Sequence, residues 1–139
     1  MIRVKIPGKF RGKGRPRFAR VGNYVRTYTP QETANYENWV RMCWHEQTDS
    51  FKFDDGLPLC AKLVIYYPIP KSTSKKNREL MLRHLVRPTK KPDADNVAKS
   101  VLDSLNSIAF KDDSQVTTLI VHKLYGEEEC VILHLSEDL

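Results

Sequence analysis

The stretch that decides the predicted fold is KKPDADNVAKSVLDSLNSI, residues 90–108. Pro88 and Pro92 keep its entry extended, because the residue before a proline avoids the α region. From about Asp95 to about Ile108, apolar residues recur at helical spacing and form one face of an amphipathic helix. These residues are Val97, Ala98, Val101, Leu102, Leu105 and Ile108. We therefore expect a helix that packs its apolar face on a sheet.

Strands are predicted on both sides of this helix. Ile2, Val4 and Ile6 alternate with polar residues, and the stretch 59–67 is rich in β-branched and aromatic residues. Two further strands, over 116–125 and 130–135, are expected to pair with each other. Gly22-Asn23 suits a two-residue hairpin turn.

Two more helices are predicted between these strands. Thr29-Pro30-Gln31-Glu32 is typical of a helix start, and the apolar residues that follow it at helical spacing predict a buried stripe. That stripe is Tyr36, Trp39, Val40, Cys43 and Trp44. A shorter helix is expected over 73–85. Strands grouped at both ends with helices between them predict an α+β class, with one mixed sheet and helices packed on it.

Length and composition favour a single domain over residues 1–139. The chain has 139 residues, of which 40% are hydrophobic and 29% are charged, as in an ordinary soluble domain. Its apolar runs are too short for a membrane span, so no membrane partner is expected. Cys43, Cys60 and Cys130 are odd in number and far apart, which favours reduced thiols in the cytoplasm.

Charge is distributed unevenly along the chain, whose net charge is +6. Residues 1–31 hold nine Lys and Arg and no acid, and residues 71–91 hold eight with one acid. Two such blocks predict DNA-binding surfaces, although a solvated basic surface is the simpler alternative. Lys13, Arg15 and Arg17 alternate with Gly14 and Pro16, so an extended segment would turn all three to one side. The second predicted patch is Lys75, Lys76, Lys90 and Lys91.

Carboxylates cluster around the central helix. Asp93 and Asp95 alternate at its entry, Asp95, Lys99 and Asp103 share one face, and Asp112-Asp113 follows it. Each has an ordinary interpretation: a helix cap at Asp95, an ion pair between Lys99 and Asp103, and a polar turn at 112–114. Together they are harder to explain, because two carboxylates 4 Å apart repel by about 4 kcal/mol at an effective dielectric near 20. A hard divalent cation such as Mg²⁺ offsets that repulsion.

These motifs resemble a known family. Lys-Pro-Asp-Ala-Asp-Asn at 91–96, then Lys99, Asp103 and Asp112-Asp113-Ser-Gln-Val, are similar to the RusA-type crossover-junction endodeoxyribonucleases, the Holliday-junction resolvases of bacteria and their phages. Ile6-Pro-Gly, Lys13-Gly-Arg-Pro-Arg-Phe and Tyr28-Thr-Pro extend the resemblance toward the N-terminus, and Lys123-Leu-Tyr-Gly extends it toward the C-terminus.

The resemblance implies a RusA-like resolvase fold and a homodimer. Such a homodimer binds four-way DNA junctions and nicks two strands symmetrically with Mg²⁺, or with Mn²⁺ as a substitute. It implies that Asp93, Asp95 and Asp113 bind the metal, that Lys99 is the essential lysine, and that Asn96, Asp103 and Asp112 lie around them. It further implies a role in recombination and repair, next to the nucleoid of a bacterial or phage-infected cell, with no small-molecule cofactor.

Two other functions stay open at this point. One is a Mg²⁺-dependent nuclease that cuts other branched DNA or RNA, and the other is a catalytically inactive DNA-binding protein. The carboxylates argue against the second, because a protein that only binds DNA gains nothing from acids next to phosphate.

Overall fold

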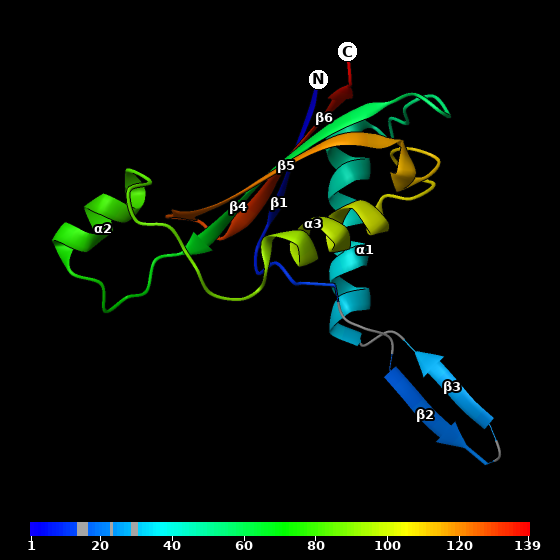
Figure 1. Ribbon diagram of the computed structural model, residues 1–139, viewed down its shortest axis with the longest axis horizontal. Coiled ribbons are helices and arrows are strands. Elements are labelled where there is room, and N and C mark those ends of the chain that lie inside the picture. The colour runs from blue at the N-terminus through cyan, green and yellow to red at the C-terminus, as the bar shows by residue number, and fades with distance from the viewer. Residues whose placement is uncertain (14–16, 23, 29–30) are drawn as a thin grey trace.

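A computed structural model describes residues 1–13, 17–22, 24–28 and 31–139, with 17–21 and 24–28 described by their backbone alone (Figure 1). Arg15 therefore lies outside the described residues, as does the side chain of Arg17. The elements are β1 (Ile2–Pro7), β2 (Arg17–Val21), β3 (Tyr24–Tyr28), α1 (Gln31–Thr48), β4 (Leu59–Pro68), α2 (Lys75–Leu82), α3 (Ala94–Ser104), a 3₁₀ turn (Asp113–Gln115), β5 (Val116–Gly126) and β6 (Cys130–Glu137).

Four strands form one mixed sheet in the order β1-β6-β4-β5. β6 runs antiparallel to both β1 and β4, whereas β5 runs parallel to β4. The remaining strands, β2 and β3, pair as the predicted hairpin around Gly22, whose φ is +59°. The α+β class with one mixed sheet is thus confirmed.

The predicted pairing of the last two strands is wrong, because β4 lies between β5 and β6. Only three residues, 127–129, connect these strands, so the chain crosses closely over β4. Gly126 makes the crossing possible, since a Cβ at this position would lie 2.8 Å from Cδ1 of Tyr66. β4 is one of the two inner strands, and the side chains on one of its faces are completely buried. These are Leu59, Ala61, Leu63 and Ile65.

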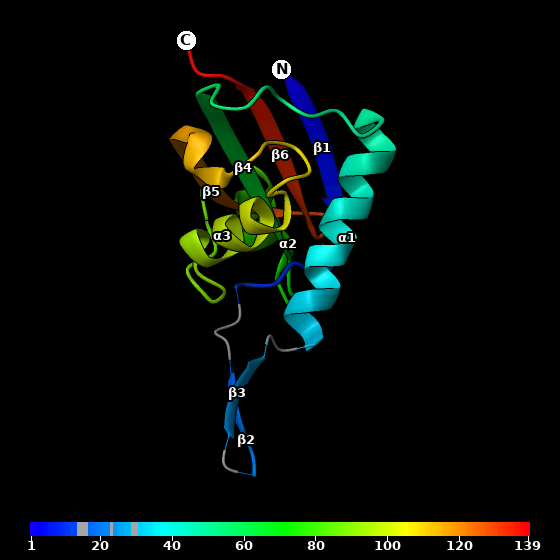
Figure 2. The same ribbon diagram turned by 90° about the vertical axis from the view of Figure 1, so that its right-hand side faces the viewer.

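The core lies between the sheet and the helices α1 and α3, which cover the same face of the sheet (Figure 2). α1 buries Tyr36, Val40, Cys43 and Trp44 as predicted. Trp39 is an exception: it is 40% exposed, and its indole N–H donates to the Pro7 carbonyl at 2.8 Å. In Figure 1, α2 stands beyond the end of the sheet, where it contacts β5. Within the described ranges, no helix is long and apolar enough to span a membrane.

α3 ends four residues before the predicted Ile108. The hydroxyl of Ser104 donates back to the carbonyls of Ser100 and Val101, at 2.9 and 2.7 Å. Ser107 then adopts a left-handed φ of +66°, which no α-helix continues. Leu105 is nevertheless completely buried. The apolar spacing that predicted the helix therefore continues past the end of α3.

Candidate active site

The first turn of α3 presents carboxylates to solvent. Asp93 occupies the N-cap position, yet its side chain makes no capping hydrogen bond. Asp95 lies in the first turn, and both residues are exposed, as is Lys99 one turn later. The ordinary interpretation of Asp95 as the helix cap therefore does not hold. The ordinary interpretation of Lys99 and Asp103 as an ion pair does not hold either, since among the described residues Asp103 pairs with Lys13 instead.

The last turn of α3 holds a different acidic pair. Asp103 is 22% exposed, and the Asp113 carboxyl lies within hydrogen-bonding reach of it. Burial, followed by the hydrogen bond and the charge of Asp103, raises the pKa of Asp113. The backbone N–H of Asp113 donates to Oδ1 of Asn106 at 2.7 Å, which fixes this turn against the residues after α3.

Asp112 has a structural role next to Asp113. Its carboxylate accepts the Ser114 N–H at 3.0 Å, and Oε1 of Gln115 accepts the Asp112 N–H at 3.3 Å, which completes a capping box. The hydrogen bonds from Ser114 lower the pKa of Asp112. Gln115 in turn donates to the carbonyls of Asp54 and Leu57. Of the two neighbouring carboxylates, only Asp113 is therefore turned to Asp103.

A cleft of about 400 Å³ opens next to the first turn of α3. It lies between the segment 9–12 and the start of α3, and its lining residues are Lys9, Phe10, Arg11, Gly12, Lys91, Pro92, Asp93 and Asn96. Gly12 is needed for this approach, since a Cβ here would meet the Cβ atoms of Asn96 and Pro92 at 3.3 Å. Cations at the rim and an apolar floor suit a phosphate-bearing strand.

Tyr67 supports the floor of this cleft from β4. Its ring meets the buried Phe10 edge-on, with centroids 4.7 Å apart, and its hydroxyl donates to the Pro92 carbonyl. Burial, with a smaller contribution from Asp93, raises the pKa of Tyr67 to about 12. Tyr67 is therefore neutral at physiological pH and holds the entry of α3 in place.

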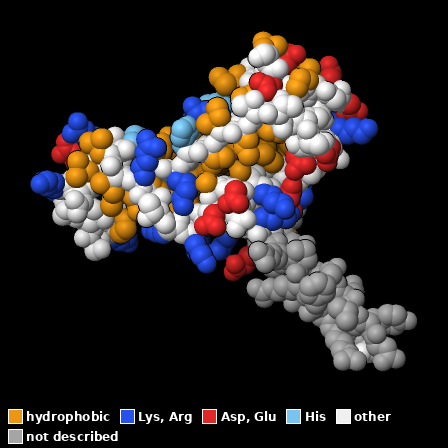
Figure 3. Space-filling model, in the orientation of Figure 1, with side chains coloured by type: hydrophobic (Ala, Val, Ile, Leu, Met, Phe, Trp, Pro, Cys, Tyr) orange, Lys and Arg blue, Asp and Glu red, His pale blue; other side chains and the backbone are white. Residues whose placement is uncertain are grey.

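The lysines of the second predicted basic patch are all exposed. Lys75 and Lys76 are exposed on α2, and Lys90 and Lys91 are exposed before α3. In Figure 3, Lys and Arg side chains gather over α2 and in the middle of the molecule, where acidic side chains lie among them. Lys13 differs from the expectation, because its side chain is only 25% exposed and its ammonium is paired with Glu37 and Asp103.

Sequence reasoning missed the residues that surround Lys13. Glu37 and Arg41 on α1 join Lys13 and the last turn of α3 in one charge network. Glu37 and Asp103 are 66 positions apart, so no local spacing points to this network. Gly12 was an available signal, since a glycine in a basic segment is typical of a close backbone approach.

The predicted ligands Asp93, Asp95 and Asp113 are all described, but the structure does not gather them into one group. Among the residues that the structure describes, no three His, Cys, Asp or Glu side chains are placed to hold a metal together. Mg²⁺ commonly takes only one or two protein carboxylates, with waters and substrate phosphate completing its shell. The exposed Asp93 and Asp95 supply such oxygens together at the first turn of α3, so this pair fits the ion by its chemistry, whereas Asp113 contacts Asp103 at the other end of the helix.

Two comparisons with known proteins bear on this site. The model of the RusA endodeoxyribonuclease family matches residues 7–135. The uncharacterized protein YqaN of Bacillus subtilis (strain 168) is 34% identical over 138 residues, which cover 98% of this chain and 96% of that protein. The match over 7–135 includes both ends of α3 and the cleft.

Proposed function

The chain belongs to the RusA endodeoxyribonuclease family, a family of junction-resolving nucleases, and we propose that it resolves four-way DNA junctions with Mg²⁺ by paired symmetric nicks. The observation that carries this proposal is the pair of exposed carboxylates, Asp93 and Asp95, next to a cleft rimmed by Lys9, Arg11 and Lys91. Carboxylates beside a surface that attracts phosphate would repel the phosphate by themselves. They are useful there if they hold a cation between protein and DNA.

Each acid has a proposed role. Asp93, Asp95 and Asp113 would hold the metal, and Mn²⁺ would substitute for Mg²⁺. Asp103 and Asn96 lie next to these carboxylates, and Asp112 shapes the turn that carries Asp113. When bound, the ion would activate water and stabilise charge on the phosphoryl oxygens and the leaving oxygen.

The chain's own residues position the DNA strand for hydrolysis. In the reaction, a water oxygen bonds to phosphorus, the bond to the 3′ oxygen breaks, and that oxygen takes a proton. The exposed ammonium of Lys99 would lie where negative charge develops on the phosphate. Lys9, Arg11 and Lys91 would bind phosphates on either side of the cut. Lys75, Lys76 and Lys90, with Arg15 and Arg17 of the predicted extended segment, would extend this contact.

We further propose that the active species is a homodimer. A four-way junction has near two-fold symmetry, and an isologous dimer presents two identical sites to it. Two matched nicks then resolve the junction in recombination and repair. This chemistry takes place on DNA in the cytoplasm of a bacterial or phage-infected cell, next to the nucleoid.

The test uses labelled four-way junction, fork, flap, matched duplex, single strand and RNA, each with Mg²⁺, with Mn²⁺ and with chelator. We expect paired nicks in the junction only, dependent on Mg²⁺ or Mn²⁺. Cutting of forks, flaps or RNA at equal rates would identify a nuclease of broader substrate range. Junction binding without cutting under any metal would indicate an inactive DNA-binding protein.

Light scattering of the active protein measures its molar mass and so tests the homodimer. A monomer at micromolar concentration would contradict the proposed dimer.

A further inference from the structure

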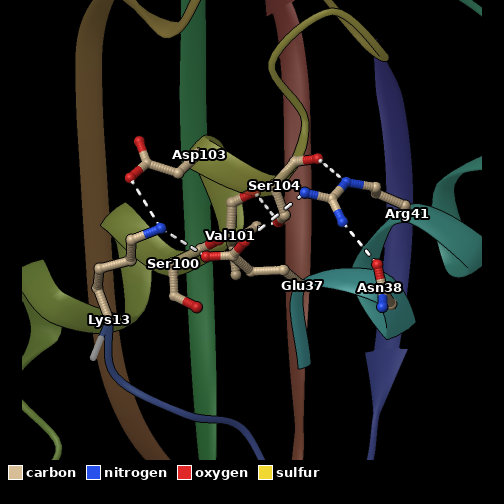
Figure 4. Close-up of polar contacts among 8 residues, drawn as sticks. All are labelled: Lys13, Glu37, Asn38, Arg41, Ser100, Val101, Asp103 and Ser104. Carbon is tan, nitrogen blue, oxygen red and sulfur yellow. Dashed lines mark hydrogen bonds and ion pairs between the residues drawn. The ribbon is translucent and has the colours of Figure 1, made fainter. Parts of the chain in front are cut away.

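Lys13 is turned into the protein although it belongs to a basic segment. Its ammonium lies 2.5 Å from Oε1 of Glu37 and 3.4 Å from Oδ2 of Asp103 (Figure 4). The side chains of Glu37 and Asp103 are 13% and 22% exposed. One cation thus pairs with a carboxylate of α1 and a carboxylate of α3.

Glu37 extends this contact into a network between the two helices. Its second oxygen, Oε2, lies 3.6 Å from the Arg41 guanidinium, and Nε of Arg41 donates to the Ser104 carbonyl at 2.9 Å. Arg41 also donates to Oδ1 of Asn38 at 2.7 Å. Figure 4 shows these side chains converging on the last turn of α3 from α1 and from the N-terminal segment.

The backbone of Lys13 is held at the other end of the same helix. Its N–H donates to the Asn96 carbonyl at 3.1 Å, in the first turn of α3, next to the close packing of Gly12. Lys13 therefore spans α3 from the turn that carries Asp95 to the turn that carries Asp103. Asp103 in turn contacts Asp113.

We propose that Lys13 is a positioning residue and not a phosphate contact. It holds the cleft segment 9–12 against the first turn of α3, and it holds Asp103 where Asp113 meets it. The inference rests on the proposed function, since the group being positioned is the proposed metal-binding carboxylate. It assigns the phosphate contacts of this segment to Lys9 and Arg11, which line the cleft.

The test compares Lys13→Met with Lys9→Met on the same labelled junction. For Lys13→Met we expect the single-turnover nicking rate of bound junction to fall by about 10–100-fold, as for a small misplacement of catalytic groups. The slope of log affinity against log salt should equal that of the unchanged protein. For Lys9→Met the slope should fall by about 0.9, the value for one lost phosphate contact. Lys52→Met, on an exposed lysine outside the site, is the matched control.

Glu37→Gln distinguishes a positioning role of Lys13 from a phosphate contact, because the two roles predict different changes in junction affinity. If Lys13 is a positioning residue, this nearly isosteric change weakens the network and lowers the nicking rate without tightening binding. If Lys13 contacts phosphate, the change frees its charge and tightens junction binding. Lys13→Arg should restore most of the rate, because a guanidinium fork serves two carboxylates.

Three results would overturn the inference: a reduced salt slope for Lys13→Met with an unchanged nicking rate, tighter binding by Glu37→Gln, or wild-type behaviour of both variants. If Lys13→Met does not fold, Glu37→Gln and Lys13→Arg still decide the question. An unchanged protein that binds junctions and never nicks them would overturn the proposed function instead, and the salt slopes would still report what Lys13 contacts.

Discussion

The two ends of α3 carry the same residue type in opposite environments. At the first turn, Asp93 and Asp95 are exposed, and Asp93 makes no capping bond. At the last turn, Asp103 is half-buried between Lys13 and Asp113. Solvent and a cation-rimmed cleft therefore surround the first pair, whereas protein groups engage the second.

The carboxylates at the two ends of this eleven-residue helix therefore have different roles. The exposed carboxylates, which have no ion-pair partner among the described residues, are available to a cation and to the DNA that brings phosphate with it. Carboxylates that already have a lysine and a neighbouring acid hold segments together. The first end should thus control activity with little effect on stability, and the second should control both.

The largest expected effect follows from Asp95→Asn. Cleavage should fall by at least about 10²–10³-fold, the range for losing one charge-stabilising group. Thermal unfolding should hardly change, because Asp95 is exposed. Junction binding should persist or tighten, since one negative charge near phosphate is gone. Single-turnover nicking, binding and unfolding are measured on one preparation, and undiminished cutting, or full activity in chelator, would contradict the assignment.

The second prediction concerns the stability of the other end. Glu37→Ala leaves Lys13 and Arg41 without their shared carboxylate, which belongs to a side chain that is 13% exposed. We expect a loss of about 1–3 kcal/mol in the free energy of unfolding, below the range for a fully buried pair. Denaturant unfolding measures it, with Glu46→Ala on the exposed side of the same helix as control. Equal stability of the two variants would remove the contrast between the ends of α3.

Local patterns predicted most of this architecture, and the comparisons confirm the family resemblance. The alternation at Ile2, Val4 and Ile6 and the helical spacing around α3 each depend on near neighbours, so they could be interpreted directly. The place of β4 between β5 and β6 depends on the approach of Gly126 to Tyr66, 60 positions apart. No periodicity encodes such a contact.

The same limit applies to the site. The spacing of Asp95, Lys99 and Asp103 correctly placed three charges on α3, and the Gln that follows Asp113 belongs to the capping box. The ordinary interpretation paired Asp103 with Lys99, four residues away, because that is the pair a helix offers by itself. Tertiary packing supplied Lys13 instead, from a segment 90 positions distant.

The third prediction tests which lysines contact DNA. Lys90→Ala with Lys91→Ala should lower the slope of log affinity against log salt by about 1.8, because each lost phosphate contact contributes about 0.9. Both side chains are exposed before the first turn of α3. Filter binding of junctions over a salt series measures the slope. A slope equal to that of the unchanged protein would show these lysines to be solvated only.

The smallest expected effect is a difference in unfolding midpoint between variants of two adjacent acids, Asp112 and Asp113. Unfolding is measured in chelator so that no metal contributes. Hydrogen bonds from Ser114 lower the pKa of Asp112, so its ionised form stabilises the fold above its unfolded pKa and this contribution is lost as pH falls. Burial and Asp103 raise the pKa of Asp113, so its ionised form destabilises the fold at neutral pH.

Asp112→Ala should therefore lower the unfolding midpoint at pH 7, and Asp113→Asn should raise it, because an amide donates to Asp103. Both differences should shrink in acid, where the carboxyls are protonated. Shifts of the same sign at pH 7 would show that the two acids share one environment, and the contrast between a capping Asp112 and an available Asp113 would then be lost.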